Sequence, residues 1–380
     1  MSNALDFHLI TGDTTSHTIL QAFEQILKKG VDIETRNGAA RTIFNAFMIT
    51  DNPRFRHLAL LGRNSNIFQM IAETLWVLSG SGKVTGFLEY LLPRATNYSD
   101  DGENWRGAYG PRLIGDSGFD QLDAVVDAFV LDGLNTRRAI AAIYNPALDS
   151  QTALTEVYGL QTTKDLPCNL LLNFYTDALG RFCLKLVQRS GDCLFGAGSI
   201  NPFEFTLIQE LVYSRVKAHY PTLQLGTFVH DVTNLHVYEQ FKAQAQAAVN
   251  TEQPVWHINT DKFQSASIKC SFRDLSHYLA LFVQACESYI LEPTDEALAD
   301  LKASYINANM VFNGGPSVNG NLLSDYMFIT LKFLIARLGL GVEGDKILNL
   351  SCNCQEDLVL AITQSKFNPF EKVLQHDGIE

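Results

Sequence analysis

The chain has 380 residues, of which 46% are hydrophobic and 18% are charged. This composition excludes disordered, collagen-like and low-complexity proteins and is typical of a folded chain with one large domain or two ordinary ones. There are 29 Lys and Arg residues against 41 Asp and Glu residues, which gives a formal net charge of −12. Such an acidic chain is not a general binder of duplex nucleic acid, so any anion pocket has to be built locally.

The apolar stretches are short and interrupted. The run over 328–338 carries Lys332 and Arg337 and is too short to span a bilayer, and the N-terminus has no signal-peptide pattern. Seven cysteines without CxxC spacing favour a reducing compartment over a disulfide framework or a zinc site. We therefore expect a cytoplasmic protein that binds no membrane and no metal.

The first predicted elements are helices. Apolar residues at helical spacing predict a helix within 19–29 and another over 67–78, in which Glu73 is an acid among apolar neighbours. Residues 94–112 are rich in Asn, Asp and Gly. This composition predicts a loop, and the loop carries Tyr109.

Three segments in the middle of the chain predict β-strands, and the second and third form a hairpin. They are residues 139–144, 169–175 and 182–188. The last strand leads into the glycine-containing loop Gln188-Arg-Ser-Gly-Asp192. A helix over 203–219 and a strand over 225–230 follow.

The pattern changes after about residue 250, where helical periodicity dominates. The predicted helices there are residues 275–289, 296–306 and 325–338. Separate helices and hairpin strands, without a repeating βαβ order, predict an α+β fold. We expect two regions, residues 1–250 and a mostly helical region over 251–380 that packs on the first or extends it.

Cys168 follows Asp165-Leu-Pro at the start of the strand over 169–175. A sulfur at a strand end can meet a ligand, and its thiolate can act as a nucleophile. A lone cysteine is more often an inert buried side chain. The nucleophile hypothesis therefore depends on the residues around it.

Several arginines stand beside small or turn-forming residues, as a phosphate site requires. They are Arg36 in Thr35-Arg-Asn-Gly38, the pair Arg137 and Arg138, and Arg189, which precedes Ser190. Any one of them alone would fit a surface salt bridge. Together, in an acidic chain, they indicate an anion pocket.

The segment from His230 to Tyr238 holds two histidines, an aspartate and a tyrosine. A metal site needs three or four converging ligands, whereas His236 and Tyr238 on one strand face supply two hydrogen-bonding groups. Recognition of a polar ligand is therefore favoured over a metal, and His230 also fits a buried core position.

The order and approximate spacing of these motifs resemble thymidylate synthase and its relatives, the pyrimidine hydroxymethyltransferases. The motifs lie between about residues 20 and 245, and they are Thr35-Arg-Asn-Gly38, Glu73-Thr-Leu-Trp-Val-Leu-Ser-Gly80, Tyr109-Gly110, Thr136-Arg-Arg-Ala-Ile140, Asp165-Leu-Pro-Cys168, Gln188-Arg-Ser-Gly-Asp192, Asn201 and His236-Val-Tyr238. The resemblance implies a thymidylate synthase-like catalytic domain over 1–250, with a mixed β-sheet at a homodimer interface. The helical region over 251–380 is then a divergent extension.

The resemblance also implies catalytic roles. Cys168 would add to C6 of a uridylate ring and make C5 a nucleophile toward the methylene carbon of 5,10-methylenetetrahydrofolate, the implied co-substrate. Glu73 would hold ordered water and move protons, since burial can raise the pKa of a carboxyl group. Tyr109 would assist proton removal at C5.

The implied binding residues surround a pyrimidine nucleotide. The substrate-binding set is Arg36, Arg137, Arg138, Gln188, Arg189, Ser190, Asp192, Asn201, His236 and Tyr238. Arg36, Arg189 and Ser190 would grip the 5′-phosphate, and His236 and Tyr238 would bond the 3′-hydroxyl. Arg137 and Arg138 would reach the phosphate site of the other subunit, which makes the implied enzyme an obligate homodimer.

Asn201 bears on which base is bound. Its amide offers a donor and an acceptor that match O4 and N3–H of uracil, whereas relatives that act on cytosine resemble this pattern but carry Asp here. Reaching Asn201 requires one extra residue in segment 196–200 relative to the family pattern. We therefore expect dUMP rather than dCMP.

Three departures from the methylating enzymes concern the product. Asn169 stands where they usually have His, and segment 94–98 lacks the tryptophan that shields their intermediate. Trp105 lies too near Tyr109 to replace that tryptophan. The short closing tail of the family is not recognisable, and about 130 residues follow the catalytic region instead.

These departures decide a branch point. After one-carbon transfer, the 5-methylene intermediate is captured either by hydride, which gives thymidylate, or by water, which gives a 5-hydroxymethyl product, and water exclusion decides between them. A missing shield and an altered tail favour water, so we expect hydroxymethylation of dUMP, as in bacteriophages with modified DNA bases. The alternatives are a thymidylate synthase, a dCMP hydroxymethyltransferase and a non-catalytic nucleotide-binding homologue.

Overall fold

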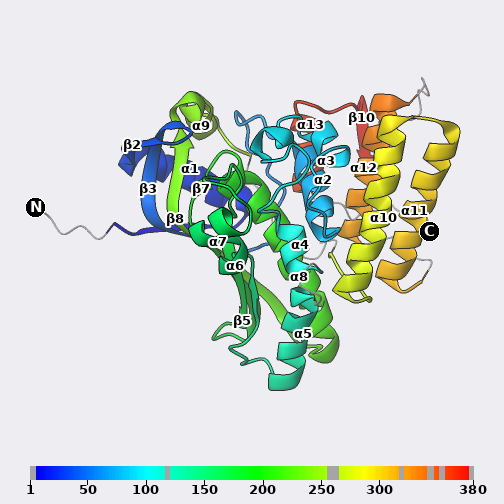
Figure 1. Cartoon of the computed structure of the whole chain (residues 1–380), viewed down its shortest axis with the longest axis horizontal. Coiled ribbons are helices and arrows are strands. Elements are labelled where there is room, and N and C mark those ends of the chain that lie inside the picture. Colours follow the sequence, from blue (N-terminus) through cyan, green and yellow to red (C-terminus); the bar gives the residue numbers. More distant parts are fainter. Residues whose placement is uncertain are drawn as a thin grey trace, which may run out of the picture.

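The computed structural model describes residues 6–115, 120–254, 265–315, 321–339, 346–350 and 356–375. Within these ranges a mixed β-sheet is covered on one face by helices, and a group of helices from the C-terminal region stands at the other end of the molecule (Figure 1). The predicted α+β class with a helical C-terminal region is confirmed.

The main sheet has eight strands. They are β1 (His8–Gly12), β2 (Val31–Thr35), β3 (Gly38–Thr50), β4 (Ile140–Ala142), β5 (Asn169–Thr176), β6 (Arg181–Gln188), β7 (Gly191–Asp192) and β8 (Gln224–Tyr238). The order is β1-β3-β8-β6-β5-β4, with β2 on the edge of β3 and β7 beside β8. β1 pairs parallel with β3 and β6 parallel with β8, whereas β3 with β8 and β4-β5-β6 are antiparallel, so the sheet is mixed.

Helices connect and cover these strands. The helices before residue 251 are α1 (Thr15–Lys29), α2 (Ile67–Leu78), α3 (Phe87–Leu91), α4 (Tyr109–Leu113), α5 (Gln121–Asp132), α6 (Pro146–Asp149), α7 (Gln151–Glu156), α8 (Asn201–His219) and α9 (Lys242–Asn250). The C-terminal elements are α10 (Phe272–Leu291), α11 (Asp295–Asn313), α12 (Leu322–Leu338), α13 (Glu356–Gln364) and the parallel strands β9 (Ile347–Leu350) and β10 (Lys372–Gln375). Helices α1 and α8 pack on one face of the sheet, and α5 packs on α8.

Several predicted elements differ from the structure in extent. The strand predicted over 225–230 continues to Tyr238, because β8 stays paired with β3 to that residue, and Val232, Leu235 and Val237 are buried along it. The predicted loop over 94–112 contains two short helical turns, η1 (Ala95–Tyr98) and the start of α4. Strands β1 to β3 and helix α5 were not predicted.

Helix α8 is the centre of the molecule. Every residue from Asn201 to Tyr213 is buried, because the helix is enclosed by the sheet on one side and by α2 and α5 on others (Figure 1). A helix buried on all sides holds its polar side chains in fixed surroundings. Two of those side chains, Glu204 and Glu210, have different environments.

A buried polar network joins α8 to the C-terminal region. Arg56 is fully buried, and its Nη2 lies 2.6 Å from Glu210 Oε2. The next residue, His57, contacts the Tyr326 hydroxyl through Nε2 at 2.7 Å and Asp357 Oδ2 through Nδ1 at 3.0 Å. Tyr326 lies on α12 and Asp357 on α13, so the C-terminal helices satisfy polar groups of the core.

No helix in the described ranges is both long enough and apolar enough to cross a membrane. The five cysteines that the structure describes are free, and Cys352 and Cys354 lie outside the described residues.

We expect Tyr326→Phe to lower the free energy of unfolding by about 1–3 kcal/mol, because it leaves the buried Nε2 of His57 without its partner. Urea denaturation measures the change. Tyr278→Phe is the matched control, since the Tyr278 hydroxyl on α10 makes no hydrogen bond with the described residues, and a change below about 0.5 kcal/mol is expected there. Equal losses in the two variants would contradict the assigned role of the network.

Candidate active site

Cys168 lies directly before β5, next to the end of β6. Arg189, which follows β6, donates from Nε to the Pro167 carbonyl at 3.0 Å and from Nη2 to the Leu166 carbonyl at 2.9 Å. Its Nη2 is also 3.6 Å from Cys168 Sγ. Burial raises the pKa of the Cys168 thiol, and the guanidinium of Arg189 acts in the opposite direction. Arg189 therefore fixes the backbone before the thiol and stabilises the thiolate.

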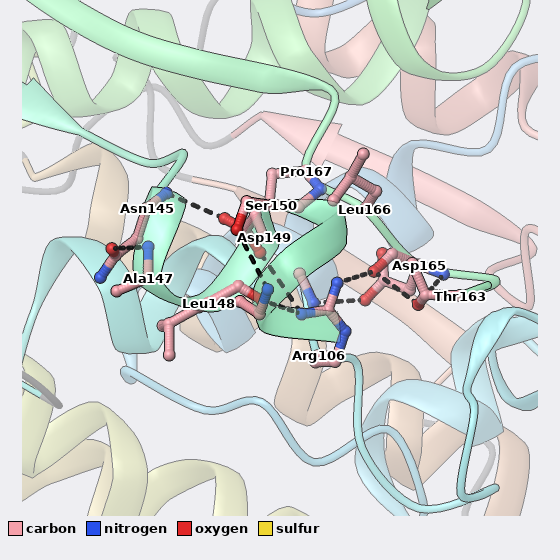
Figure 2. Close-up of polar contacts among 12 residues, drawn as sticks. Arg106, Asn145, Ala147, Leu148, Asp149, Ser150, Thr163, Asp165, Leu166 and Pro167 are labelled. Atoms are coloured by element: carbon pink, nitrogen blue, oxygen red, sulfur yellow. Dashed lines mark hydrogen bonds and ion pairs between the residues drawn. The ribbon is translucent and has the colours of Figure 1, made fainter. Parts of the chain in front are cut away.

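The segment before Cys168 is held by a polar scaffold (Figure 2). Asp165 Oδ2 accepts from the Gly107 backbone at 2.6 Å, and Arg106 Nη2 donates to the Asp165 carbonyl at 3.3 Å. Arg106 also donates to the Leu148 carbonyl at 2.8 Å and pairs with the buried Asp149 at 3.5 Å. Sequence reasoning missed Arg106 and Asp149, since nothing in a loop sequence indicates which distant groups it binds.

Two of the predicted phosphate ligands converge near the thiol. Arg36 is exposed at the turn between β2 and β3, and its Nη1 donates to the Thr163 carbonyl at 2.9 Å. Arg36 and Arg189 both lower the pKa of Cys168, so both positive charges lie close to it. Ser190 follows Arg189 and is half-buried.

Arg137 and Arg138 lie elsewhere, on the exposed segment before β4. Arg138 pairs with Asp132 at 2.6 Å, at the end of α5. Neither arginine contacts Arg36 or Arg189 of the same chain within the described ranges. That Arg137 and Arg138 reach the phosphate site of a second subunit remains a prediction.

The end of β8 presents the two residues predicted to bind the sugar. The rings of His236 and Tyr238 lie edge to face at 4.9 Å, and the Tyr238 hydroxyl accepts from Asn37 Nδ2 at 3.3 Å. His236 Nδ1 donates to Asn234 Oδ1 at 3.0 Å, and burial lowers the pKa of His236, so the ring is neutral. Its buried Nε2 has no partner among the described residues and can accept a hydrogen bond from a hydroxyl group.

Four buried side chains, including that of Asn201, form a hydrogen-bonded chain that ends at Glu204. His230 Nε2 donates to Gln188 Oε1 at 2.7 Å, and Gln188 Nε2 donates to Asn201 Oδ1 at 3.0 Å. Asn201 Nδ2 donates in turn to Glu204 Oε1 at 3.3 Å. Burial lowers the pKa of His230 to about 3, so this histidine is a neutral donor. Sequence reasoning identified Gln188 and Asn201 but missed Glu204.

The turn before Asn201 is a π-helical turn, η2 (Gly196–Ile200), in which the Ile200 N–H donates to the Phe195 carbonyl at 3.1 Å. A π-turn holds one residue more than an α-helical turn, so it accommodates the extra residue predicted here. Arg63 donates to the Gly198 carbonyl at 3.1 Å and thereby ties the turn to the core.

Glu73 and Tyr109 flank this region. Burial raises the pKa of Glu73 to about 7, against the opposing effects of Gln69 and Arg94. A carboxyl group with such a pKa can accept and release a proton near neutral pH. Burial, together with the nearby Cys168, raises the pKa of Tyr109 well above its usual value, so its hydroxyl stays protonated.

Asn169 occupies the first position of β5, beside Cys168. It is fully buried, and neither its side-chain oxygen nor its nitrogen has a hydrogen-bond partner among the described residues. Buried amides are normally satisfied, so this one needs a ligand or an ordered water. The site therefore has polar groups that await a partner next to the nucleophile.

A cavity of about 750 Å³ opens beside Glu73 and is large enough for a cofactor-sized molecule. Among the predicted site residues, Glu73, Asp192 and Tyr238 line it. Aromatic and cationic side chains make up much of the remaining wall, and they are Phe68, Tyr90, Tyr98, Phe195, Phe333, Phe367, Arg63, Arg94, Arg337 and Lys366. Burial raises the pKa of Asp192 to about 6, so its carboxyl group is ionised at neutral pH.

The C-terminal region supplies part of this wall. Phe333 and Arg337 come from α12, and Lys366 and Phe367 follow α13. The apolar helical runs of this region predicted no site residue, because such runs give no sign of which cavity they border. Trp105 is absent from the wall: its indole N–H donates to the Ala95 carbonyl at 2.8 Å and its ring packs against another tryptophan.

A sequence profile described as thymidylate synthase matches residues 17–278, more than two thirds of the chain. The chain belongs to the thymidylate synthase family. The predicted resemblance, which covered about residues 20–245, is therefore confirmed. The site geometry agrees with membership, since a cysteine, an arginine at its sulfur and a buried asparagine amide come together at the ends of β5, β6 and α8.

Curated relatives are phage proteins named deoxyuridylate hydroxymethyltransferase. One from Delftia phage PhiW-14 is 38% identical over 377 residues, covering 97% of this chain and 99% of that protein. Others from Bacillus phage SP01 and Pseudomonas phage M6 are each 29% identical and match 61% and 58% of this chain, with 59% and 58% of their own lengths. The first match extends through the C-terminal region that borders the cavity.

Proposed function

We propose that this chain transfers a one-carbon unit from methylenetetrahydrofolate to C5 of dUMP and releases 5-hydroxymethyl-dUMP. The family and the phage relatives support a pyrimidine C5 one-carbon transferase. The observation that carries the proposal is the short path between Cys168 and Asn201. Asn169, beside the nucleophile, pairs across the strands with Gln188, and Gln188 holds the Asn201 amide.

The unpartnered polar groups fit a uridylate. Asn201 keeps one N–H and one oxygen lone pair free, which match O4 and N3–H of uracil. Arg36 and Arg189 supply positive charge for a 5′-phosphate, and the free Nε2 of His236 can accept a hydrogen bond from a sugar hydroxyl.

The chemistry begins at Cys168. Its thiolate adds to C6, and the electrons of the C5–C6 double bond move toward C5 and O4. When bound, methylenetetrahydrofolate supplies a one-carbon unit that bonds to C5. Loss of the C5 proton, assisted by Tyr109, would then leave an exocyclic 5-methylene group on the pyrimidine, as the bond between the one-carbon unit and the folate nitrogen breaks, its electrons stay on that nitrogen, and tetrahydrofolate leaves.

Water completes the reaction. It adds to the methylene carbon and loses a proton, while the bond between Cys168 and C6 breaks and its electrons return to sulfur. Glu73, with its pKa of about 7, is placed to take and return protons through ordered water. The product exceeds dUMP by CH₂O. The absence of Trp105 from the cavity wall supports water capture.

The cavity lining fits a folate. Rings such as Phe68 and Phe195 suit a flat pterin, and Arg337 and Lys366 suit the carboxylates of a glutamyl group. The cavity also reaches Glu73, so a molecule held there adjoins the catalytic acid.

Mass spectrometry of the nucleotide formed from dUMP and methylenetetrahydrofolate tests the proposal. We expect a gain of CH₂O, release of tetrahydrofolate and loss of turnover by about 10³-fold or more in Cys168→Ala. Cys183→Ala, at a buried cysteine of β6, is the control and should retain activity. A gain of CH₂ with dihydrofolate would identify a thymidylate synthase, and a product from dCMP alone would overturn the choice of substrate.

The proposed dimer uses the open face of the main sheet. Half-exposed apolar side chains lie on this face in two registered pairs, Ile49 with Val229 and Val187 with Leu171. Phe47 and Val187 stand on either side of Asp231, which pairs with Lys185 at 2.7 Å. A second copy would remove this apolar face from water. Arg137 precedes β4 at the edge of the same sheet, where it can reach the partner.

Mixing two inactive variants tests the sharing of Arg137. If it serves the partner subunit, an equal mixture of Cys168→Ala and Arg137→Ala should regain about a quarter of wild-type activity, because half of the dimers are mixed and each has one intact site. Activity is measured after subunits are exchanged in mild denaturant and refolded. No recovery, with mixed dimers shown by mass spectrometry, would place Arg137 in its own subunit's site.

Binding of tetrahydrofolate to the dUMP-saturated enzyme tests whether Arg337 and Lys366, which line the cavity, contribute to folate affinity. We expect Arg337→Ala combined with Lys366→Ala to raise the Kd about three- to tenfold, measured by calorimetry, and to leave the Kd for dUMP unchanged. Lys302→Ala removes an exposed charge on α11 away from the cavity and is the matched control. Unchanged folate affinity in the double variant would remove the C-terminal region from the folate site.

A further inference from the structure

Helix α8 carries two buried glutamates with opposite surroundings. Glu210 is paired with Arg54 at 2.6 Å and with Arg56 at 2.6 Å. Glu204 is 1% exposed and has no cation among its described partners; its Oε1 accepts from Asn201, and its Oε2 has no described hydrogen-bond partner. A buried carboxyl group without a cation is unfavourable for stability. Glu210 has a structural explanation, and Glu204 requires another.

The charge state of Glu204 follows from its surroundings. Burial raises its pKa well above the usual value, Glu73 on α2 raises it further, and the hydrogen bond from Asn201 opposes the shift. These effects favour the neutral form of Glu204, which has one carbonyl acceptor and one O–H donor.

The hydrogen bonds from His230 to Glu204 all run in one direction. His230 donates to Gln188, Gln188 donates to Asn201, and Asn201 donates to Glu204. These bonds use one N–H and one lone pair of the Asn201 amide. The other N–H can donate to O4 of a 4-oxo pyrimidine, and the other lone pair can accept from its N3–H.

A 4-amino pyrimidine needs the opposite arrangement, because it donates at N4 and accepts at N3. Rotating the Asn201 amide would bring its NH₂ group against the NH₂ group of Gln188. Gln188 would then have to rotate as well, and the proton of His230 would move to Nδ1, which is buried and has no partner in the described part of the chain. An unpaired buried donor is unfavourable, so the observed direction is preferred.

We propose that Glu204 is a positioning residue that holds the Asn201 amide in the orientation fixed from the His230 end of the chain, and thereby strengthens the preference of this site for uracil over cytosine. The inference rests on the proposed function, since it concerns how the same nucleotide is recognised. Glu204 acts through Asn201 and terminates the chain that begins at His230. Its carbonyl oxygen accepts the amide N–H that would otherwise be free to turn away from the base.

Two substitutions separate positioning from charge. Glu204→Gln keeps an oxygen acceptor in the same place and mimics the neutral acid. Glu204→Met has a similar length, removes the acceptor and suits a buried apolar site. The Kd values for dUMP and dCMP, measured by calorimetry on the full-length protein, and kcat/KM for both nucleotides are the readouts.

We expect Glu204→Met to weaken dUMP binding about tenfold with little change for dCMP, so that the ratio of the two Kd values falls about tenfold. Glu204→Gln should stay within about threefold of wild type in that ratio. It should also keep the rise of kcat through about pH 7 that ionisation of Glu73 produces. A purely structural role for Glu204 would not lower the ratio of the two Kd values in Glu204→Met and preserve it in Glu204→Gln.

The outcomes that overturn the proposal are distinct from failure of the proposed function. An unchanged dUMP-to-dCMP ratio in Glu204→Met, in protein whose unfolding midpoint matches wild type, would overturn it. Equal weakening of both nucleotides would also do so. If Glu204→Met does not fold, the ratio of the Kd values for dUMP and dCMP is compared in Glu204→Gln and Asn201→Ala. An equal fall of that ratio in the two variants would refute the positioning role. Wild-type protein that binds neither nucleotide would instead contradict the proposed function.

Discussion

The buried pair of Arg56 and Glu210 is the constraint on which the rest of the molecule depends. A guanidinium with no exposure must keep its carboxylate, because breaking such a pair costs about 3–5 kcal/mol. Glu210 lies on α8, so the pair fixes that helix along its own axis. The first residue of the same helix, Asn201, is thereby held opposite Gln188. A stability element at one point of α8 thus sets the geometry of recognition about two turns away.

The polar groups of the core divide into two kinds. Some are fully satisfied, such as Asp149, which accepts from two arginines and a backbone N–H, and they hold the segments around Cys168 in place. Others, including both side-chain atoms of Asn169 and Oε2 of Glu204, have no described partner. The first kind makes the scaffold rigid, and the second kind lies where a substrate or water has to complete the hydrogen bonding.

The sequence predicted what local chemistry encodes. Helical periodicity predicted the segment 67–78 as a helix, and the Cys168 and Gln188–Asp192 motifs indicated the family. Strand β3 was missed because its Ala39-Ala40-Arg41-Thr42 start has no clear alternation, and this segment becomes a strand through pairing with β2 and β8. Glu204 and the cavity wall from α12 could not be predicted, since their partners are distant in the chain and leave no mark on the sequence around them.

The attachment of the C-terminal helices has a consequence for how the molecule is made. His57 is separated from Tyr326 by 269 residues and from Asp357 by 300, so these contacts close very long stretches of chain. On the ribosome, the motif residues are all synthesised before the groups that satisfy the core beneath them. Until Tyr326 and Asp357 have been synthesised, the polar groups of His57 stay hydrated, and this part of the core reaches its final packing only afterwards.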